Sequence, residues 1–244
     1  MEIKGYHYAT DIGKVRTHNE DAVNIFKNEN CILMVVADGM GGHAAGDVAA
    51  RMTVDKISES FSDKLKFSSS EEARVWIKNI LQVINQDILD HSKKYNATKG
   101  MGTTLVMALI TNDFISFVNI GDSRAYILSY NYLRQITKDH TFVRRLVEEG
   151  QLSERAARLH PQKNVIVNSL GTSSSLEFDY LVLERFDIDA ILLCTDGLTG
   201  LVEDLEILEI ISTDEIIAKK IEKLISKANE LGGNDNISVA MCEL

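Results

Sequence analysis

Two aspartate–glycine pairs that follow apolar segments are the residues of this sequence best placed to do chemistry. Residues 32–37 are followed by Asp38-Gly39, and residues 190–195 are followed by Asp196-Gly197. We expect both apolar segments to be buried strands, so each carboxylate should lie where a strand ends. The glycine after each carboxylate permits a sharp turn and lets a carbonyl oxygen approach a ligand closely.

Two further acidic sites lie beside polar or glycine-rich sequence. Asp235 directly precedes an expected strand, and Glu20 and Asp21 follow Arg16 near the N-terminus. One Asp-Gly pair after a strand is usually only a turn, but four such acidic sites favour a shared functional site. Converging carboxylates repel one another and need a positive charge between them.

Oxygen ligands point to a particular class of metal. The chain has no Cys/His spacing typical of zinc, so carboxylate and carbonyl ligation predicts Mg²⁺ or Mn²⁺, with Ca²⁺ as a non-catalytic competitor. A carboxylate-rich chain also fits this chemistry, because Asp and Glu outnumber Lys and Arg by 36 to 26.

Helical periodicity marks three segments that would frame the acidic sites. Apolar residues recur at helical spacing in residues 46–61, 70–95 and 214–231. Ser69 or Ser70, followed by Glu71 and Glu72, is typical of a helix N-terminus. Two short helices are expected within residues 141–170, a polar segment with basic patches.

Strand-forming residues occupy most of the remaining chain. We expect strands at residues 103–110, 114–120, 124–128, 133–136, 181–185, 190–194 and 237–242, with a hairpin at Asn112-Asp113. Strands that are grouped between long helices predict an α+β protein in which sheet packs on sheet with helices outside. Without repeats or a Pro-rich or Gly/Ser-rich linker, residues 1–244 are expected to form one domain.

Composition excludes several classes of protein. The net charge of −10 argues against nucleic acid as the main partner. No apolar stretch approaches the roughly 20 residues that span a bilayer, and the N-terminus lacks the pattern of a signal peptide. Cys31, Cys194 and Cys242 are few and widely spaced, so we expect buried thiols in the cytoplasm.

Six motifs in order resemble those of bacterial type 2C metal-dependent serine/threonine protein phosphatases. The resemblance covers essentially the whole chain. The motifs are Arg16-Thr-His-Asn-Glu-Asp21, Val36-Ala-Asp-Gly-Met-Gly-Gly-His43, Gly102-Thr-Thr104, Gly121-Asp-Ser-Arg124, Cys194-Thr-Asp-Gly-Leu198 and Gly233-Asn-Asp-Asn236. The resemblance implies a four-layer α/β/β/α sandwich, two antiparallel sheets flanked by helices, with two or three Mn²⁺ or Mg²⁺ ions at one end.

The resemblance also implies how the metals would be held. Asp38 would bridge two metals, Asp196 and Asp235 would complete the shell of one, and the carbonyl of Gly39 would bind the other. Glu20 would act through a metal-bound water.

Three more acidic or basic positions match the family. Asp21 would support the metal ligands, and Arg16 would grip the phosphate with its planar fork of donors. Asp122, with Asp196, would hold a third metal; the alternative is a strand-end ion pair between Asp122 and Arg124.

By the same resemblance, a water held between two cations would attack the phosphorus of phosphoserine or phosphothreonine in line, without a phosphoenzyme. Met40 stands where many eukaryotic relatives have a histidine, so His43 is the nearest candidate general acid; its alternative is a histidine that touches no substrate. The substrates would be phosphorylated proteins, with a bacterial serine/threonine kinase as the opposing enzyme and the phosphatase acting as a monomer.

Residues 141–170 match the family's variable flap, a subdomain that influences substrate choice. Asn168 replaces the basic residue expected near its end. The flap arginines would steer acidic phosphoproteins, or would simply be a solvated helix face; they are Arg144, Arg145, Arg155 and Arg158.

Competing interpretations are weaker. No cysteine has an arginine six residues later, which excludes a thiol phosphatase. Gly39-Met-Gly41-Gly-His-Ala44 is only a loose dinucleotide-binding pattern, and it would place Asp38 against a pyrophosphate. A scaffold without activity would be expected to lack metal carboxylates, which are present here. A hydrolase for another phosphoester remains an alternative.

Overall fold

Strands that are apolar on both faces determine the layering of this protein. The computed structural model describes residues 3–41 and 45–244, without the side chain of Arg158. Every residue of β5 (Leu105–Ile110), β6 (Phe114–Ile120) and β10 (Ala190–Cys194) is buried. A strand that is buried on both faces needs a layer above and a layer below it, which a sandwich with outer helices provides.

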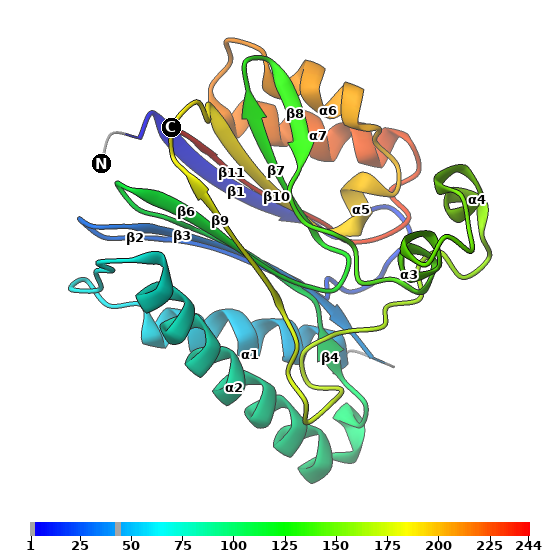
Figure 1. Ribbon diagram of the computed structural model, residues 1–244. Helices are drawn as coiled ribbons and strands as arrows, with labels where there is room; N and C mark the ends of the chain where they lie inside the picture. The colour runs from blue at the N-terminus through cyan, green and yellow to red at the C-terminus, as the bar shows by residue number, and fades with distance from the viewer. Residues whose placement is uncertain (1–2, 42–44) are drawn as a thin grey trace.

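Two antiparallel sheets form the centre of the molecule (Figure 1). The first sheet has the order β1 (Gly5–Asp11), β11 (Ile237–Glu243), β10, β7 (Arg124–Ser129) and β8 (Tyr132–Gln135). The second sheet has the order β2 (Asp21–Lys27), β3 (Ile32–Met40), β5, β6 and β9 (Asp179–Glu184), with the short β4 (Gly102–Thr103) paired to β3.

Helices cover the outer face of each sheet (Figure 1). The second sheet is covered by α1 (Ala45–Ser60) and α2 (Ser70–Lys94), and the 3₁₀ turn η1 (Asn96–Thr98) follows α2. The first sheet is covered by α5 (Asp196–Thr199), α6 (Asp204–Ile211) and α7 (Ile217–Glu230). The short helices α3 (Phe142–Glu148) and α4 (Glu154–Leu159) lie beside one end of the sandwich.

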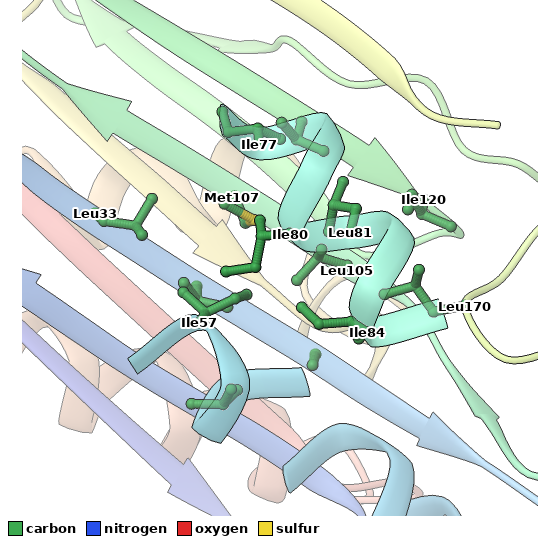
Figure 2. Packing of buried hydrophobic residues seen from close by; sticks show 14 of the residues in the cluster. Leu33, Ile57, Ile77, Ile80, Leu81, Ile84, Leu105, Met107, Ile120 and Leu170 are labelled. Carbon is green, nitrogen blue, oxygen red and sulfur yellow. The ribbon is translucent and has the colours of Figure 1, made fainter. Parts of the chain in front are cut away.

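Three hydrophobic layers hold these four layers together. Between α2 and the second sheet, Ile80, Leu81 and Ile84 point toward Leu105 and Met107 (Figure 2). The layer between the sheets includes Val36, Phe117, Ile191 and Ala240. The third layer joins the first sheet to α6 and α7, and includes Leu192, Ile207 and Leu224.

Local sequence explains where α2 begins. The Ser69 side chain accepts a hydrogen bond from the backbone N–H of Glu72 at 3.2 Å, which satisfies one of the unpaired amides at a helix start. Glu71 and Glu72 in the first turn and basic residues in the last turn oppose the helix dipole.

The expected α+β sandwich is confirmed, with several differences in detail. The sequence pattern does not predict β1, β2 or α6. For β1 the reason is that it is an edge strand whose residues are all exposed or half-buried, so its apolar pattern is weak. The strand expected over residues 103–110 is interrupted at Thr104. The helix expected from residue 214 begins at Ile217.

The turn expected after Asp38 is wrong. Asp38 and Gly39 both lie inside β3, which continues to Met40. The other Asp-Gly pair ends its strand as expected, but Asp196 then opens the short helix α5.

Two remaining expectations concern the cysteines and the membrane. Cys31, Cys194 and Cys242 are buried free thiols, as predicted. Among the helices of the described residues, none has the length and apolar character needed to cross a bilayer.

The inward face of α2 should carry most of its contribution to stability. We expect Leu81→Ala to lower the free energy of unfolding by about 2–5 kcal/mol, since this side chain is fully buried. The matched control is Val83→Ala on the same helix, where the side chain is 49% exposed, and its effect should be within about 0.5 kcal/mol. Urea unfolding measures both; comparable losses would contradict this packing.

Candidate metal centre

Asp38 is held in place by hydrogen bonds to its main chain. Its N–H donates to Thr104 Oγ1 at 3.0 Å. Its carbonyl accepts from the Thr104 N–H at 2.8 Å and from the Thr103 hydroxyl at 2.9 Å. The Thr104 hydroxyl also lies 2.7 Å from the Ser123 hydroxyl, which joins Asp38 to the loop that carries Asp122. Thr104, the residue at which the strand is interrupted between β4 and β5, therefore helps to position Asp38.

Gly39 is required by close packing rather than by a turn. A Cβ atom at this position would lie 2.1 Å from the Gly46 carbonyl oxygen and 2.6 Å from that of Glu20. The Gly39 N–H donates to the Glu20 carbonyl at 3.1 Å. The absence of a side chain thus lets the start of α1 and the Glu20 segment approach the strand that carries Asp38.

Asp196 reaches the same place from the first sheet. It opens α5 directly after β10, and its charge raises the pKa of Asp38. A Cβ atom at Gly197 would lie 1.9 Å from the Asn236 carbonyl oxygen. This close approach brings α5 against the loop that precedes β11, where Asp235 lies.

Asp235 forms an ion pair with Arg16. Among the described residues, no other ion pair involves Glu20, Asp21, Asp38, Asp122, Asp196 or Asp235. Arg16 Nη2 lies 2.8 Å from Asp235 Oδ2. The other oxygen of Asp235 accepts from the Asn236 N–H at 2.9 Å. The pKa of Arg16 is raised, first by this hydrogen bond and then by the charge of Asp235.

Glu20 joins the same end of the sandwich through its main chain. Its N–H donates to Asn236 Oδ1 at 2.8 Å. Burial raises the pKa of Glu20, and the charge of Arg16 opposes that rise.

Asp21 lies behind Asp38 and is buried. The two residues are directly paired in the register of β2 and β3. The Thr195 hydroxyl donates to Asp21 Oδ2 at 3.0 Å. Burial is the largest influence on this carboxyl and raises its pKa to about 7, against the opposing hydrogen bonds from Ser238 and Thr195.

Asp122 is also buried, and it has an unsatisfied oxygen. Among the described residues, Oδ1 of Asp122 has no hydrogen-bond partner. Burial and then the charge of Asp196 raise its pKa to about 8. The alternative of an ion pair with Arg124 is wrong, because the guanidinium of Arg124 instead binds both oxygens of Asp139, at distances down to 2.7 Å.

The electrostatics at this end of the sandwich favour the binding of a cation. Burial, and then the charges of neighbouring carboxylates, raise the pKa of Asp38 well above its ordinary value. The neighbours are Asp21, Asp196, Asp122 and Asp235. Two carboxylates cannot donate hydrogen bonds to each other, so their charges call for a cation or a proton between them.

The carboxylate oxygens of these residues are the kind of ligand that divalent cations such as Mg²⁺ and Mn²⁺ prefer. In the described part of the chain, no three His, Cys, Asp or Glu side chains stand as a ready ligand shell. Asp235 is instead held by Arg16. Buried oxygens that repel one another, one of them unpartnered, are what a hard divalent ion would compensate.

The predicted flap arginines lie apart from these carboxyl groups in the hydrogen-bond network. Arg144 pairs with Glu148 and Glu154, and Arg145 pairs with Glu149. Arg155 is exposed, and the side chain of Arg158 is outside the described part of the structure. His43, the candidate general acid, also lies outside the described residues.

Several organising residues received no role in the sequence analysis. Asn236 is the clearest, because its side chain donates to the carbonyls of Ile12 and His18 and accepts from Glu20. Asn236 is the last residue of the sixth motif, and this position was the one sequence feature that could have indicated its role. Thr104 likewise lies in a motif, whereas no motif contains His140.

Comparison with known proteins agrees with the six motifs. The description "Protein phosphatase 2C" belongs to the family profile that matches residues 13–232. The serine/threonine phosphatase stp of Listeria monocytogenes serotype 4b is 39% identical over 237 residues, covering 97% of this chain and 94% of the relative.

Two solved structures share the fold. Serine/threonine phosphatase Stp1 of Staphylococcus aureus superposes with a TM-score of 0.93 at 34% identity, covering 100% of this chain and 96% of the other. The catalytic domain of the phosphatase PstP, in complex with two manganese ions, gives a TM-score of 0.85 at 33% identity, with coverage of 98% and 97%. With a matching profile over most of its length and relatives of this similarity, the chain belongs to the protein phosphatase 2C family.

Proposed function

We propose that this protein hydrolyses phosphoserine and phosphothreonine on proteins and depends on two or three Mn²⁺ or Mg²⁺ ions. The observation that carries the proposal is the convergence of Asp38, Asp196 and Asp235 from separate elements, with raised pKa values for the first two. Membership of the family and the manganese complex of the related PstP structure support the metal dependence.

The proposed ligands are those that the motifs imply. Asp38 would bridge two ions, the Gly39 carbonyl would bind one of them, and Asp196 and Asp235 would bind the other. Glu20 would act through water. The unpartnered oxygen of Asp122 and its proximity to the charge of Asp196 support a third ion between these two residues.

The protein's own residues bind and orient the phosphoryl group. When bound, the cations would supply Lewis-acid activation of water and neutralise phosphoryl charge. Arg16 is half-exposed, at 51% for its side chain, and its planar fork can form two parallel bonds to a phosphoryl group. Asp235 already holds this guanidinium at the edge of the site. We propose His43 as the donor of a proton to the departing serine or threonine oxygen.

We further infer the setting in which the protein works. Its substrates would include the products of a serine/threonine kinase, and it would act in the cytoplasm as a monomer without nucleic acid; the net charge of −10 and three buried free thiols support this. Residues 141–170 would form the flap beside the site, within a single domain. Paired charges on Arg144 and Arg145 favour a solvated face over a direct role in steering.

Metal reconstitution is the first test of the proposed function. Metal-stripped protein should hydrolyse a phosphothreonine peptide only after Mn²⁺ or Mg²⁺ is added, and not with Ca²⁺. Asp38→Asn and Asp196→Asn should each lower kcat by at least about 100-fold, since each removes charge that positions an ion. Circular dichroism confirms folding of each variant. Activity without any added metal, or none with any metal, would overturn the proposal, the second result favouring a scaffold.

Arg16 should act on phosphate binding rather than on folding. We expect Arg16→Ala to lower kcat/KM for the same peptide by about 10- to 100-fold, as expected for losing charge-assisted hydrogen bonds worth about 1.5–3 kcal/mol. Arg16→Lys should recover only part of this loss, because an ammonium lacks the planar fork. Full activity of Arg16→Ala in Mn²⁺-saturated enzyme would rule out the assigned role.

The stabilising effect of metal should depend on pH. Asp21 and Asp122 have pKa values raised to about 7 and about 8, so the metal-free folded state binds more protons than the unfolded state. Their contribution to stability is present below the ordinary carboxyl pKa and is lost as pH rises toward 8. A cation should relieve this loss.

Thermal unfolding with and without Mn²⁺ measures the effect. At pH 8, with the ion about 100 times above its dissociation constant, Tm should rise by about 5–10 °C. The rise should be clearly smaller at pH 5, where protons already occupy the cluster, and should shrink in Asp38→Asn. An equal rise at both pH values would contradict the raised pKa values.

A further inference from the structure

His140 lies at the base of the flap and contacts both ends of it. This residue precedes α3, which lies beside the same end of the sandwich as α5 (Figure 1). Its side chain is only 16% exposed. Its polar contacts reach three other parts of the chain, at Gly121, at Val167 and Asn168, and at Asp179.

The first contact is with the loop that carries Asp122. The Gly121 N–H donates to His140 Nδ1 at 3.2 Å, and the His140 N–H donates to the Gly121 carbonyl at 2.8 Å. Gly121 has a φ of +102°, and a Cβ atom there would lie 2.6 Å from Thr104 Cγ2. His140 therefore holds a glycine in a conformation that other residues rarely adopt, directly before a carboxylate of the candidate metal centre.

The second contact is with the end of the flap. Asn168 Nδ2 lies 3.1 Å from His140 Nδ1 and donates also to the Glu177 carbonyl at 3.0 Å. The Val167 N–H donates to the His140 carbonyl at 2.9 Å. One histidine thus joins the residues that enter and leave the segment 141–170.

These contacts determine which ring nitrogen carries the proton. Nδ1 faces two N–H donors, so it must be the acceptor, and in the neutral ring Nε2 then carries the hydrogen. Nε2 lies 3.2 Å from Asp179 Oδ2 at the start of β9, so it donates to this carboxylate. The ring supplies an acceptor on one side and a donor on the other, which an aliphatic side chain cannot do.

The end of the flap is connected to Asp38 as well. Leu170 and Thr103 exchange backbone hydrogen bonds of 3.1 and 2.9 Å, and the Thr103 hydroxyl donates to the Asp38 carbonyl at 2.9 Å. Leu170 at the end of the flap is therefore linked through Thr103 to β3, the strand that carries Asp38.

We propose that His140 is a positioning residue that pins both ends of the flap to the Asp122 loop and thereby sets the affinity for protein substrates. This inference rests on the proposed function, because it takes residues 141–170 as the flap beside the phosphate site. A small phosphoester needs only the metal centre and Arg16, whereas a phosphoprotein must also fit against the flap. The effect should therefore appear mainly in KM for large substrates.

Three variants separate the contacts of this histidine. His140→Asn places an amide oxygen where Nδ1 stands and keeps an acceptor for Gly121, while His140→Gln does not. Asn168→Ala leaves the Gly121 contact and removes the bonds from the end of the flap to His140 and to the Glu177 carbonyl. His91→Asn is the matched control, since Nδ1 of His91 also forms a hydrogen bond, with Thr98, but none is found in the described residues between His91 and Gly121, Asn168 or Asp179.

Hydrogen exchange in Mn²⁺-loaded protein gives a readout independent of activity. We expect His140→Gln to increase exchange in both residues 119–123 and residues 141–170. Asn168→Ala should increase exchange only in residues 141–170, and His140→Asn should retain most protection at residues 119–123. Unchanged exchange in His140→Gln, or the same pattern in His91→Asn, would overturn the proposal.

Kinetics with two substrates completes the test. In His140→Gln, KM for a phosphothreonine protein should rise about tenfold, as expected for losing two or three hydrogen bonds, while kcat with p-nitrophenyl phosphate stays within about threefold. Equal losses with both substrates would overturn the positioning role and indicate damage to the metal centre. A different result would be wild-type protein that has no Mn²⁺-dependent activity, while its variants show the expected exchange pattern. That result would overturn the proposed function but support the role of His140 in holding the flap to the Asp122 loop.

Discussion

Mutual repulsion among buried and half-buried carboxyl groups is the interaction that governs the rest of this fold. Asp21, Asp38, Asp122 and Asp196 lie at one end of the two sheets, and burial raises the pKa of each of them. In the folded chain without metal, the Thr195 hydroxyl and the Arg16 guanidinium offset part of this cost. Divalent cations would remove the cost directly, so the same arrangement that strains the fold prepares it for metal.

Close backbone contacts make the convergence possible. The carboxylates come from both sheets, and they meet only because chain segments touch where glycine leaves room, at Gly39 against Gly46 and at Gly197 against Asn236. Threonine hydroxyls then fix the strands in place around Asp38 and Asp21. The sandwich behind these contacts, with its three apolar layers, holds the acidic residues of both sheets together at one end.

The proposed flap, residues 141–170, is organised by different means. Arg144 and Arg145 form ion pairs with glutamates of the same segment. Its ends are fastened by neutral hydrogen bonds through Asn168 and Leu170 and by the His140 bond to Asp179. A segment with few core residues but well-fastened ends can differ in sequence without disturbing the metal centre, which is the behaviour expected of a region that selects substrates.

Hydrophobic periodicity and ordered motifs are local signals, so the α+β sandwich, the long helices, most strands and the acidic residues that converge at one end were predictable from the sequence. It did not reveal β1 or α6, and it misplaced a turn at Gly39, because whether a glycine turns or merely makes room depends on what packs against it. Only the tertiary structure decided that Arg124 binds Asp139 rather than Asp122, and that His140 joins Gly121, Asn168 and Asp179. Partner choice among polar groups is set by distance and burial across the fold, and neither quantity is encoded by spacing along the chain.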